Sequence, residues 1–136
     1  MSFARKNNTA MNLLLWILQI LLAMVFSYSG INKSIYSERA LVAKGQTGVE
    51  GLPTGLIRFI GIAEILGSIG ILLPCLINVF PLLTPVSALC LALIMVPAAI
   101  IHYKRIPKSK KEGNNVITNI VLFVMCLIVA YGRLKP

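Results

Sequence analysis

One acidic residue, Glu64, lies in the middle of a strongly apolar stretch, residues 56–73. A carboxylate at membrane depth is costly unless it is paired, protonated or in contact with water. In such a place it can hold a charge, accept hydrogen bonds or exchange a proton with a bound molecule. We therefore take Glu64 as the first candidate functional residue, and the next question is which groups lie near it.

Lys33 and His102, which can carry a positive charge, stand at the ends of neighbouring apolar stretches. If these stretches cross a membrane antiparallel, both fall in the same half as Glu64, which lies eight residues, or about 12 Å, inside its own stretch. Lys33 would hold the charge of Glu64, and His102 would relay protons because histidine titrates near neutral pH. Arg58 and Asn119 fall in the same half and complete the candidates for ligand binding or proton exchange.

Each of these candidates also has a simpler explanation. Glu64 and Lys33 could form a structural ion pair that locks two helices together instead of lining a polar cavity. Lys33 and Arg58 could extend to the membrane surface, and His102 could be an interfacial residue. The sequence leaves cavity and lock open. A metal site is not expected, since one histidine, one intramembrane carboxylate and no nearby cysteine give too few ligands.

The composition indicates a membrane protein. Hydrophobic residues make up 57% of the 136 residues and charged residues only 12%, against about 45–50% and about 25% in soluble domains. A chain of this length is expected to form a single domain, residues 1–136. The formal net charge of +9 comes from Lys and Arg residues that flank apolar runs. There they set topology and contact the lipid bilayer, so nucleic-acid binding is not expected.

Four apolar runs are candidates to span the bilayer: residues 12–31, 56–73, 82–101 and 116–131. Inside a bilayer each run must satisfy its own backbone hydrogen bonds and is therefore helical. We predict an all-α membrane protein, an antiparallel up-down bundle of four transmembrane helices. The first run is too long for the apolar core of a signal peptide, so it is expected to be retained.

The loops that join these runs predict the orientation. Eight Lys and Arg residues lie in loops 32–55 and 102–115, against four in the tails and the remaining loop. The positive-inside rule therefore favours a cytoplasmic position for the two charged loops. The first loop is also expected to hold a short helix whose apolar Ile35, Leu41 and Val42 suit the membrane interface better than the core.

Narrow stripes of small or polar residues run along three of the predicted helices and should face the bundle interior, because lipid surrounds the outside. The stripes are Gln19, Ala23, Phe26, Gly30 and Lys33; Gly61, Glu64 and Ser68; and Asn119, Cys126 and Ala130. The three cysteines form no Cys-x-x-Cys pair, which argues against a dithiol redox centre.

Several of these motifs occur together over nearly the whole chain after residue 11. The first helix ends Phe26-Ser27-Tyr28-Ser29-Gly30-Ile31-Asn32-Lys33, the second carries Gly61-x-x-Glu64-x-x-Gly67-x-x-Gly70, and the third closes Ala98-Ala99-Ile100-Ile101-His102. In this combination the chain resembles the DoxX-like family of small four-helix membrane proteins. The resemblance implies a bundle in the bacterial cytoplasmic (inner) membrane, with Lys33, Glu64 and His102 as its polar positions.

The resemblance also suggests a function. The family takes its name from the small subunit of a thiosulfate:quinone oxidoreductase, although no residue here singles out thiosulfate. It implies an accessory subunit of a membrane redox system that binds a quinone or another lipophilic molecule and a redox partner subunit. Whether the chain is an enzyme stays open, and no other cofactor is evident. The alternatives are an assembly or chaperone-like factor that binds transmembrane helices, and a small proton-coupled transporter. A homo-oligomer is compatible with each.

Overall fold

The computed structural model describes the backbone of residues 2–107 and 109–134, and the side chains of these residues from Thr9 onward. All regular elements of this part of the chain are helices: α1 (Ser2–Ile35), α2 (Glu38–Ala43), a short 3-10 helix η1 (Thr47–Val49), α3 (Thr54–Ile77), α4 (Leu83–Arg105) and α5 (Lys111–Leu134). The side chains of Arg5, Lys6, Lys108 and Lys135, which entered the charge count above, lie outside the described residues.

Four of the helices are long and apolar enough to cross a membrane, with candidate spans Thr9–Ile35, Thr54–Ile77, Leu83–Arg105 and Lys111–Leu134. This confirms the predicted all-α membrane bundle. Three of the four sequence-predicted ranges lie inside the observed helices, and the range 82–101 starts one residue early. The helices are longer than the apolar runs because a helix continues through its polar flanks to the membrane surface, whereas hydropathy marks only its apolar middle.

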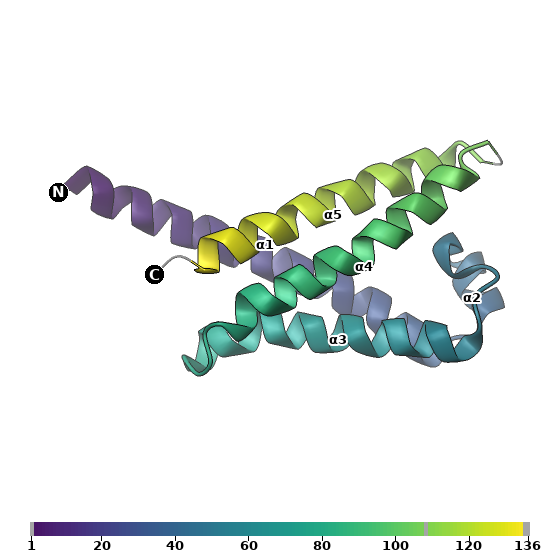
Figure 1. Ribbon diagram of the computed structural model, residues 1–136, viewed down its shortest axis with the longest axis horizontal. Coiled ribbons are helices and arrows are strands. Elements are labelled where there is room, and N and C mark those ends of the chain that lie inside the picture. The colour runs from purple at the N-terminus through teal and green to yellow at the C-terminus, as the bar shows by residue number, and fades with distance from the viewer. Residues whose placement is uncertain (1, 108, 135–136) are drawn as a thin grey trace.

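The four long helices form a ring in which each one packs against its chain neighbour. Contacts join α1 to α3, α3 to α4, α4 to α5 and α5 back to α1. Successive helices run in opposite directions, so the two charged loops lie at one end of the molecule (Figure 1). We call this the loop end, and the opposite end the terminal end. The arrangement is the predicted antiparallel up-down bundle.

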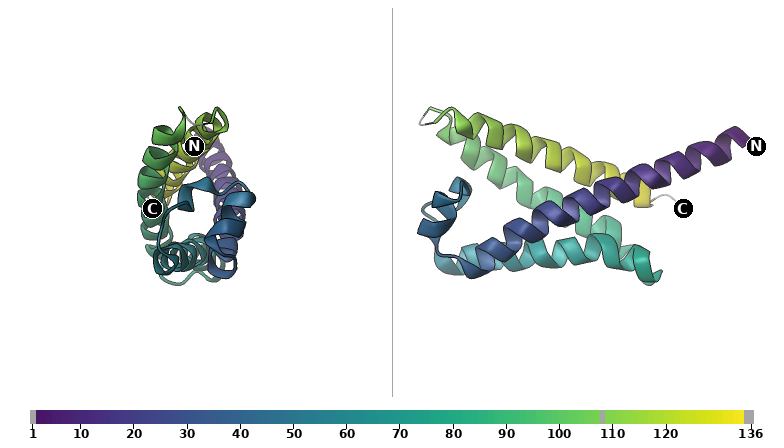
Figure 2. Two further views of the ribbon diagram at one scale, coloured as in Figure 1. Left: turned by 90° about the vertical axis from the view of Figure 1, so that its right-hand side faces the viewer. Right: turned by 180° about the vertical axis from the view of Figure 1, so that it is seen from behind.

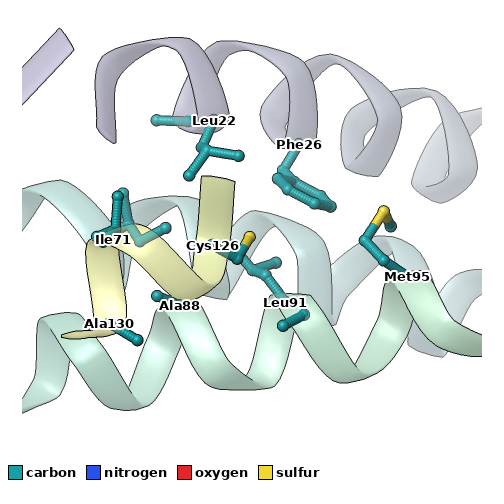
Figure 3. Packing of buried hydrophobic residues seen from close by; sticks show 11 residues of the cluster. Leu22, Phe26, Ile71, Ala88, Leu91, Met95, Cys126 and Ala130 are labelled. Carbon is teal, nitrogen blue, oxygen red and sulfur yellow. The ribbon is translucent and has the colours of Figure 1, made fainter. Parts of the chain in front are cut away.

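The middle of the bundle is an apolar core to which all four long helices contribute. Figure 3 shows Leu22 and Phe26 of α1 facing Leu91 and Met95 of α4. Most residues of the predicted stripes face inward: Gln19, Phe26, Glu64, Ser68, Cys126 and Ala130 are all at most 3% exposed. Asn119 of the third stripe is only half-buried. The apolar residues outside these stripes are largely exposed, as expected for side chains that face lipid.

At the loop end, the pair α1–α3 separates from the pair α4–α5, and α2 with η1 lies between them (Figures 1 and 2). Leu41 of α2 is 0% exposed and packs with Val49 and Ile57 in a second, smaller apolar cluster. The expectation that Leu41 lies at the membrane interface is therefore wrong. The separated helix ends leave apolar surface that the loop segment covers, and burial there is more favourable for Leu41 than exposure.

Candidate functional site

Glu64 and Lys33 form an ion pair between α3 and α1. Lys33 Nζ lies 2.7 Å from Glu64 Oε1, and the side chains of Glu64 and Lys33 are 1% and 14% exposed. The predicted partnership is therefore present in the structure. A hydrogen bond between two charged groups in a dry setting is stronger than a neutral one, and it offsets much of the cost of burying them.

Two glycines bring the backbones of α1 and α3 close together beside this ion pair. A Cβ atom added to Gly61 would lie 2.8 Å from the carbonyl oxygen of Gly30 and 2.9 Å from Lys33 Cβ. A Cβ atom added to Gly30 would lie 2.7 Å from the carbonyl oxygen of Gly61. Only glycine allows this approach. The crossing places the start of the Lys33 side chain directly against α3, one helical turn from Glu64.

The second carboxylate oxygen of Glu64 is the unusual atom of the site. Glu64 Oε2 is buried and has no hydrogen-bond partner among the described residues. The nearby hydroxyl of Ser68 donates to the backbone oxygen of Glu64 at 2.8 Å, so it does not serve the carboxylate. Buried polar atoms in proteins almost always have a partner, and an exception needs an explanation. A purely structural lock between two helices does not require a free acceptor.

A second buried atom at the same end also lacks a partner. Asn32 Nδ2, a hydrogen-bond donor on the residue before Lys33, has no acceptor among the described residues although Asn32 is only 7% exposed. The loop half of the α1–α3 pair thus contains one unused acceptor and one unused donor. The sequence gives no signal for Asn32, because polar residues near the end of a membrane helix can reach the interface.

Arg58 supports Lys33, and the described residues provide no hydrogen bond or ion pair between Arg58 and Glu64. Its Nη1 donates to the backbone oxygens of Lys33 at 2.6 Å and Tyr36 at 2.8 Å. Carbonyl groups in the last turn of a helix have no partner within the helix, and a cationic donor satisfies them well. Arg58 therefore caps the end of α1 and fixes the backbone from which Lys33 extends.

His102 lies in a different cluster from Glu64. It is 8% exposed, and its Nδ1 lies 2.5 Å from Oε2 of Glu112, a residue that is itself 5% exposed. The other oxygen of Glu112 accepts a hydrogen bond from Thr47 Oγ1 at 2.6 Å. The described residues provide no hydrogen bond between His102 and Glu64. The described hydrogen bonds therefore provide no direct path for the proton exchange between His102 and Glu64 that the sequence suggested.

Arg105 completes this cluster, which we call the loop-end network: Thr47, Glu50, His102, Arg105 and Glu112. Arg105 forms an ion pair with Glu50, donates to the backbone oxygen of Thr47 at 2.5 Å, and lies 4.0 Å from Glu112. The network joins η1 to both α4 and α5. It therefore holds the α2–η1 segment in place between the separated helix pairs.

Asn119 lies at about the depth of the apolar core and bonds within its own helix. Its Nδ2 donates to the backbone oxygen of Asn115 at 2.8 Å. The helices α4 and α5 run antiparallel, and His102 of α4 lies against Glu112 of α5. Met95 and Asn119 each lie seven residues from this pair toward the middle of the bundle, so they are at the same depth. The described residues provide no hydrogen bond between Asn119 and Glu64, so the structure gives Asn119 no polar link to the ion-pair site.

Glu112 is the main site residue that sequence reasoning missed. It was counted within a loop, whereas the structure places it in the first turn of α5. A signal was available: Glu112 is the one acidic residue of the basic segment 102–115. A lone carboxylate ten residues from a histidine across a helix–turn–helix connection is well placed to pair with it. Gln19 was assigned to the correct face, but its partner Arg133 was not foreseen.

The DoxX-like family model matches residues 17–129, a range that runs from α1 into α5 and contains the ion pair and His102. Neither the curated proteins nor the solved structures contain a match to this chain. The family match covers most of the 136 residues, and the helical bundle observed agrees with it. The chain therefore belongs to the DoxX-like family.

Proposed function

We propose that this protein is an accessory subunit of a membrane redox system and binds a lipophilic molecule with a hydroxyl-bearing head, such as a hydroquinone, at Glu64 and Lys33. The observation that carries the proposal is the unpartnered, buried oxygen Glu64 Oε2. A ligand hydroxyl supplies the donor that this acceptor lacks. The redox setting and the partner subunit rest on membership of the family alone.

The charges around Glu64 suit a neutral ligand better than an ion. Lys33 already balances the carboxylate at 2.7 Å, so a second cation would add an unbalanced positive charge inside the bundle. A neutral hydroxyl can donate one hydrogen bond to Glu64 Oε2 and accept one from Lys33 Nζ, which has hydrogens left after its bond to Oε1. This double role selects a hydroxyl over a carbonyl or an ether.

The neighbouring apolar residues suit the rest of such a ligand. Phe26 lies one turn before Gly30 on the same face of α1, and Met95 lies one turn after Leu91, the residue against which Gly67 packs. Phe26 and Met95 belong to the same buried cluster, and Figure 3 shows both toward one end of it. An aromatic ring and a flexible thioether adapt well to a planar aromatic head or a prenyl-type tail.

Each polar residue then has a defined role. Glu64 accepts the hydrogen bond from the hydroxyl and takes its proton if the hydroxyl ionises. Lys33 holds the charge of Glu64 and donates to the hydroxyl oxygen, and Arg58 fixes the position of Lys33 through the end of α1. His102 has no role in binding the ligand; through Glu112 it holds the α2–η1 segment at the loop end.

The test is equilibrium binding of decylhydroquinone to the detergent-solubilised protein, measured by calorimetry. Glu64→Gln is compared with Glu112→Gln, which alters the other buried, paired carboxylate and serves as the matched control. A hydrogen bond to a charged group contributes about 1.5–3 kcal/mol, so Glu64→Gln is expected to weaken binding by at least about tenfold. Glu112→Gln is expected to bind like the wild type.

A second probe checks the chemistry of the head group. The dimethyl ether of decylhydroquinone has no hydroxyl donor and is expected to bind no more tightly to the wild type than to Glu64→Gln. Equal binding of decylhydroquinone to the wild type and Glu64→Gln would contradict the proposal. If the wild type binds neither probe and co-purifies with one other membrane protein, the assembly-factor alternative is favoured. Glu64 would then be a structural lock.

A further inference from the structure

Arg133 occupies the terminal end of the bundle, opposite the loop-end network. It lies in the last turn of α5. The neighbouring Gly132 lets α5 approach α1 closely, since a Cβ atom added to Gly132 would lie 2.6 Å from Leu15 Cδ2. This approach directs the Arg133 guanidinium toward Gln19, a polar residue that is 0% exposed.

The guanidinium is only partly satisfied there. Arg133 Nε donates to Gln19 Oε1 at 2.7 Å, and Nη1 donates to Asn12 Oδ1 at 2.8 Å. Both acceptors are neutral amides. Arg133 Nη2 is buried and has no acceptor among the described residues. The ring of Trp16 lies 5.4 Å from the guanidinium carbon and covers it on one side.

No carboxylate side chain balances this charge. The whole chain has four acidic residues, and each has a partner elsewhere in the structure. Glu38 accepts from the backbone of Gly51, Glu50 pairs with Arg105, Glu64 pairs with Lys33, and Glu112 pairs with His102. A half-buried guanidinium with neutral acceptors and one unused nitrogen is an incomplete site, because buried charges in proteins are normally paired with an opposite charge.

We propose that Arg133 binds the phosphate of a membrane phospholipid at the terminal end of the bundle. A guanidinium presents parallel N–H donors that match two phosphate oxygens. The end of a membrane-spanning helix lies at the level of the lipid head groups, and Trp16 beside Arg133 is typical of that level. A phosphate therefore arrives from the surrounding bilayer at the depth of the guanidinium.

In this arrangement the phosphate replaces Asn12 as the hydrogen-bond partner of Arg133 Nη1. Asn12 is exposed, and its bond to Nη1 lies at the surface of the protein. A phosphate oxygen is a stronger acceptor for a guanidinium than a neutral amide. When it displaces Asn12, Nη1 and the unused Nη2 bind the phosphate together, while Nε keeps its bond to the buried Gln19. Gln19 is thus the positioning residue and Asn12 the replaceable one.

The experiment measures lipid retention by native mass spectrometry after purification in a non-ionic detergent. The protein carries a short C-terminal extension, so that a terminal carboxylate cannot act as the counter-charge. Phosphatidylglycerol is compared with diacylglycerol, which has the same chains and no phosphate. The wild type is expected to retain phosphatidylglycerol about tenfold more, equivalent to about 1.4 kcal/mol. Arg133→Gln should lose this preference, and the control Arg39→Gln, which removes an exposed cation on α2, should keep it.

Other variants and a soluble competitor complete the test. Asn12→Ala is expected to keep the preference for phosphatidylglycerol, and Arg133→Lys, which has no guanidinium fork, is expected to lose most of it. If Arg133→Gln does not fold, the preference of these two variants for phosphatidylglycerol over diacylglycerol provides the test. An unchanged preference in Arg133→Lys, or the same loss in Arg39→Gln, would overturn the proposal. Displacement of phosphatidylglycerol by inorganic phosphate would overturn the lipid assignment and point to a soluble phosphate.

Discussion

Replacing Lys33 with methionine tests whether the ion pair with Glu64 is an integral part of the bundle. Methionine keeps most of the apolar stem of lysine and removes the ammonium group. Glu64, at 1% exposure, would then hold a carboxylate with no charged partner among the described residues. We expect the protein to lose stability and Glu64 to become the main source of that loss.

The magnitude follows from the burial of the two partners. Removing one member of a buried ion pair typically costs about 3–5 kcal/mol, because the remaining charge is left without compensation. Water reaches Lys33 in part, since its side chain is 14% exposed, so the pair is not fully desolvated. We therefore expect Lys33→Met to lower the free energy of unfolding by about 3 kcal/mol. Glu64→Met should cost less, because the freed lysine can extend to the surface.

The double variant Lys33→Met/Glu64→Met separates the ion pair from simple packing. Replacing both members of a buried pair with apolar residues is often neutral or stabilising. We expect the double variant to be within about 1 kcal/mol of the wild type, which gives a coupling energy of at least about 2 kcal/mol. The double variant should fold but fail to bind decylhydroquinone.

The assay is unfolding in mixed micelles of increasing SDS content, followed by far-ultraviolet circular dichroism on all four proteins of the cycle. The circular dichroism signal reports directly on the helices that make up the protein. Additive effects, with the double variant as unstable as the two single variants combined, would rule out a coupled ion pair. They would mean that Lys33 and Glu64 act independently and that the ion pair is not a unit of the structure.

Three further predictions concern other parts of the molecule. Gly61→Ala should destabilise the bundle by about 1–3 kcal/mol, because the added Cβ atom would clash with the backbone of α1. In the same SDS titration, the control Gly55→Ala should be neutral or slightly stabilising, because a Cβ atom there meets nothing within 4 Å. Glu112→Gln should weaken the contacts between the loop-end network and η1. The expected result is faster amide hydrogen exchange in residues 38–50 and unchanged exchange in the middle of α3. Equal exchange of residues 38–50 in the wild type and the variant would contradict this role. A cysteine introduced at Ser109 should react with a membrane-impermeant thiol reagent only from the cytoplasmic side. Labelling of intact cells above the background of the native cysteines would contradict the orientation predicted from the charged loops.

The helices and their inward faces could be predicted because a membrane limits the choices so strongly. An apolar run of about 20 residues in a bilayer has to be helical, and its polar stripe has to face other helices. Lys33 and Glu64 followed from the same logic, since an acidic residue in such a run needs a partner and α1 offered one at the matching depth. The Gly30–Gly61 crossing, which sets the geometry of the pair, depends on how two backbones meet and could not be predicted.

The position of His102 could not be predicted because the competing partner lay in a segment taken for a loop. His102 and Glu64 were predicted to share one half of the membrane, but sharing a half fixes neither the exact depth nor the direction around the bundle. Glu112 lies ten residues away across a tight connection, and forming a contact over so short a loop costs little entropy. The separation of the helix pairs at the loop end, which makes room for α2 and η1, is a property of the packing of all four helices. No local pattern encodes it.

Glu64 is proposed to bind a ligand in addition to holding α1 and α3 together. Native mass spectrometry of the wild type and Glu64→Gln, each released from a mild detergent, distinguishes these two roles. We predict an adduct of lipophilic small-molecule mass on the wild type that is absent from Glu64→Gln, with both proteins showing the same helical content. A bare wild type, or the same adduct on both proteins, would contradict the claim and leave Glu64 and Lys33 as a lock between α1 and α3.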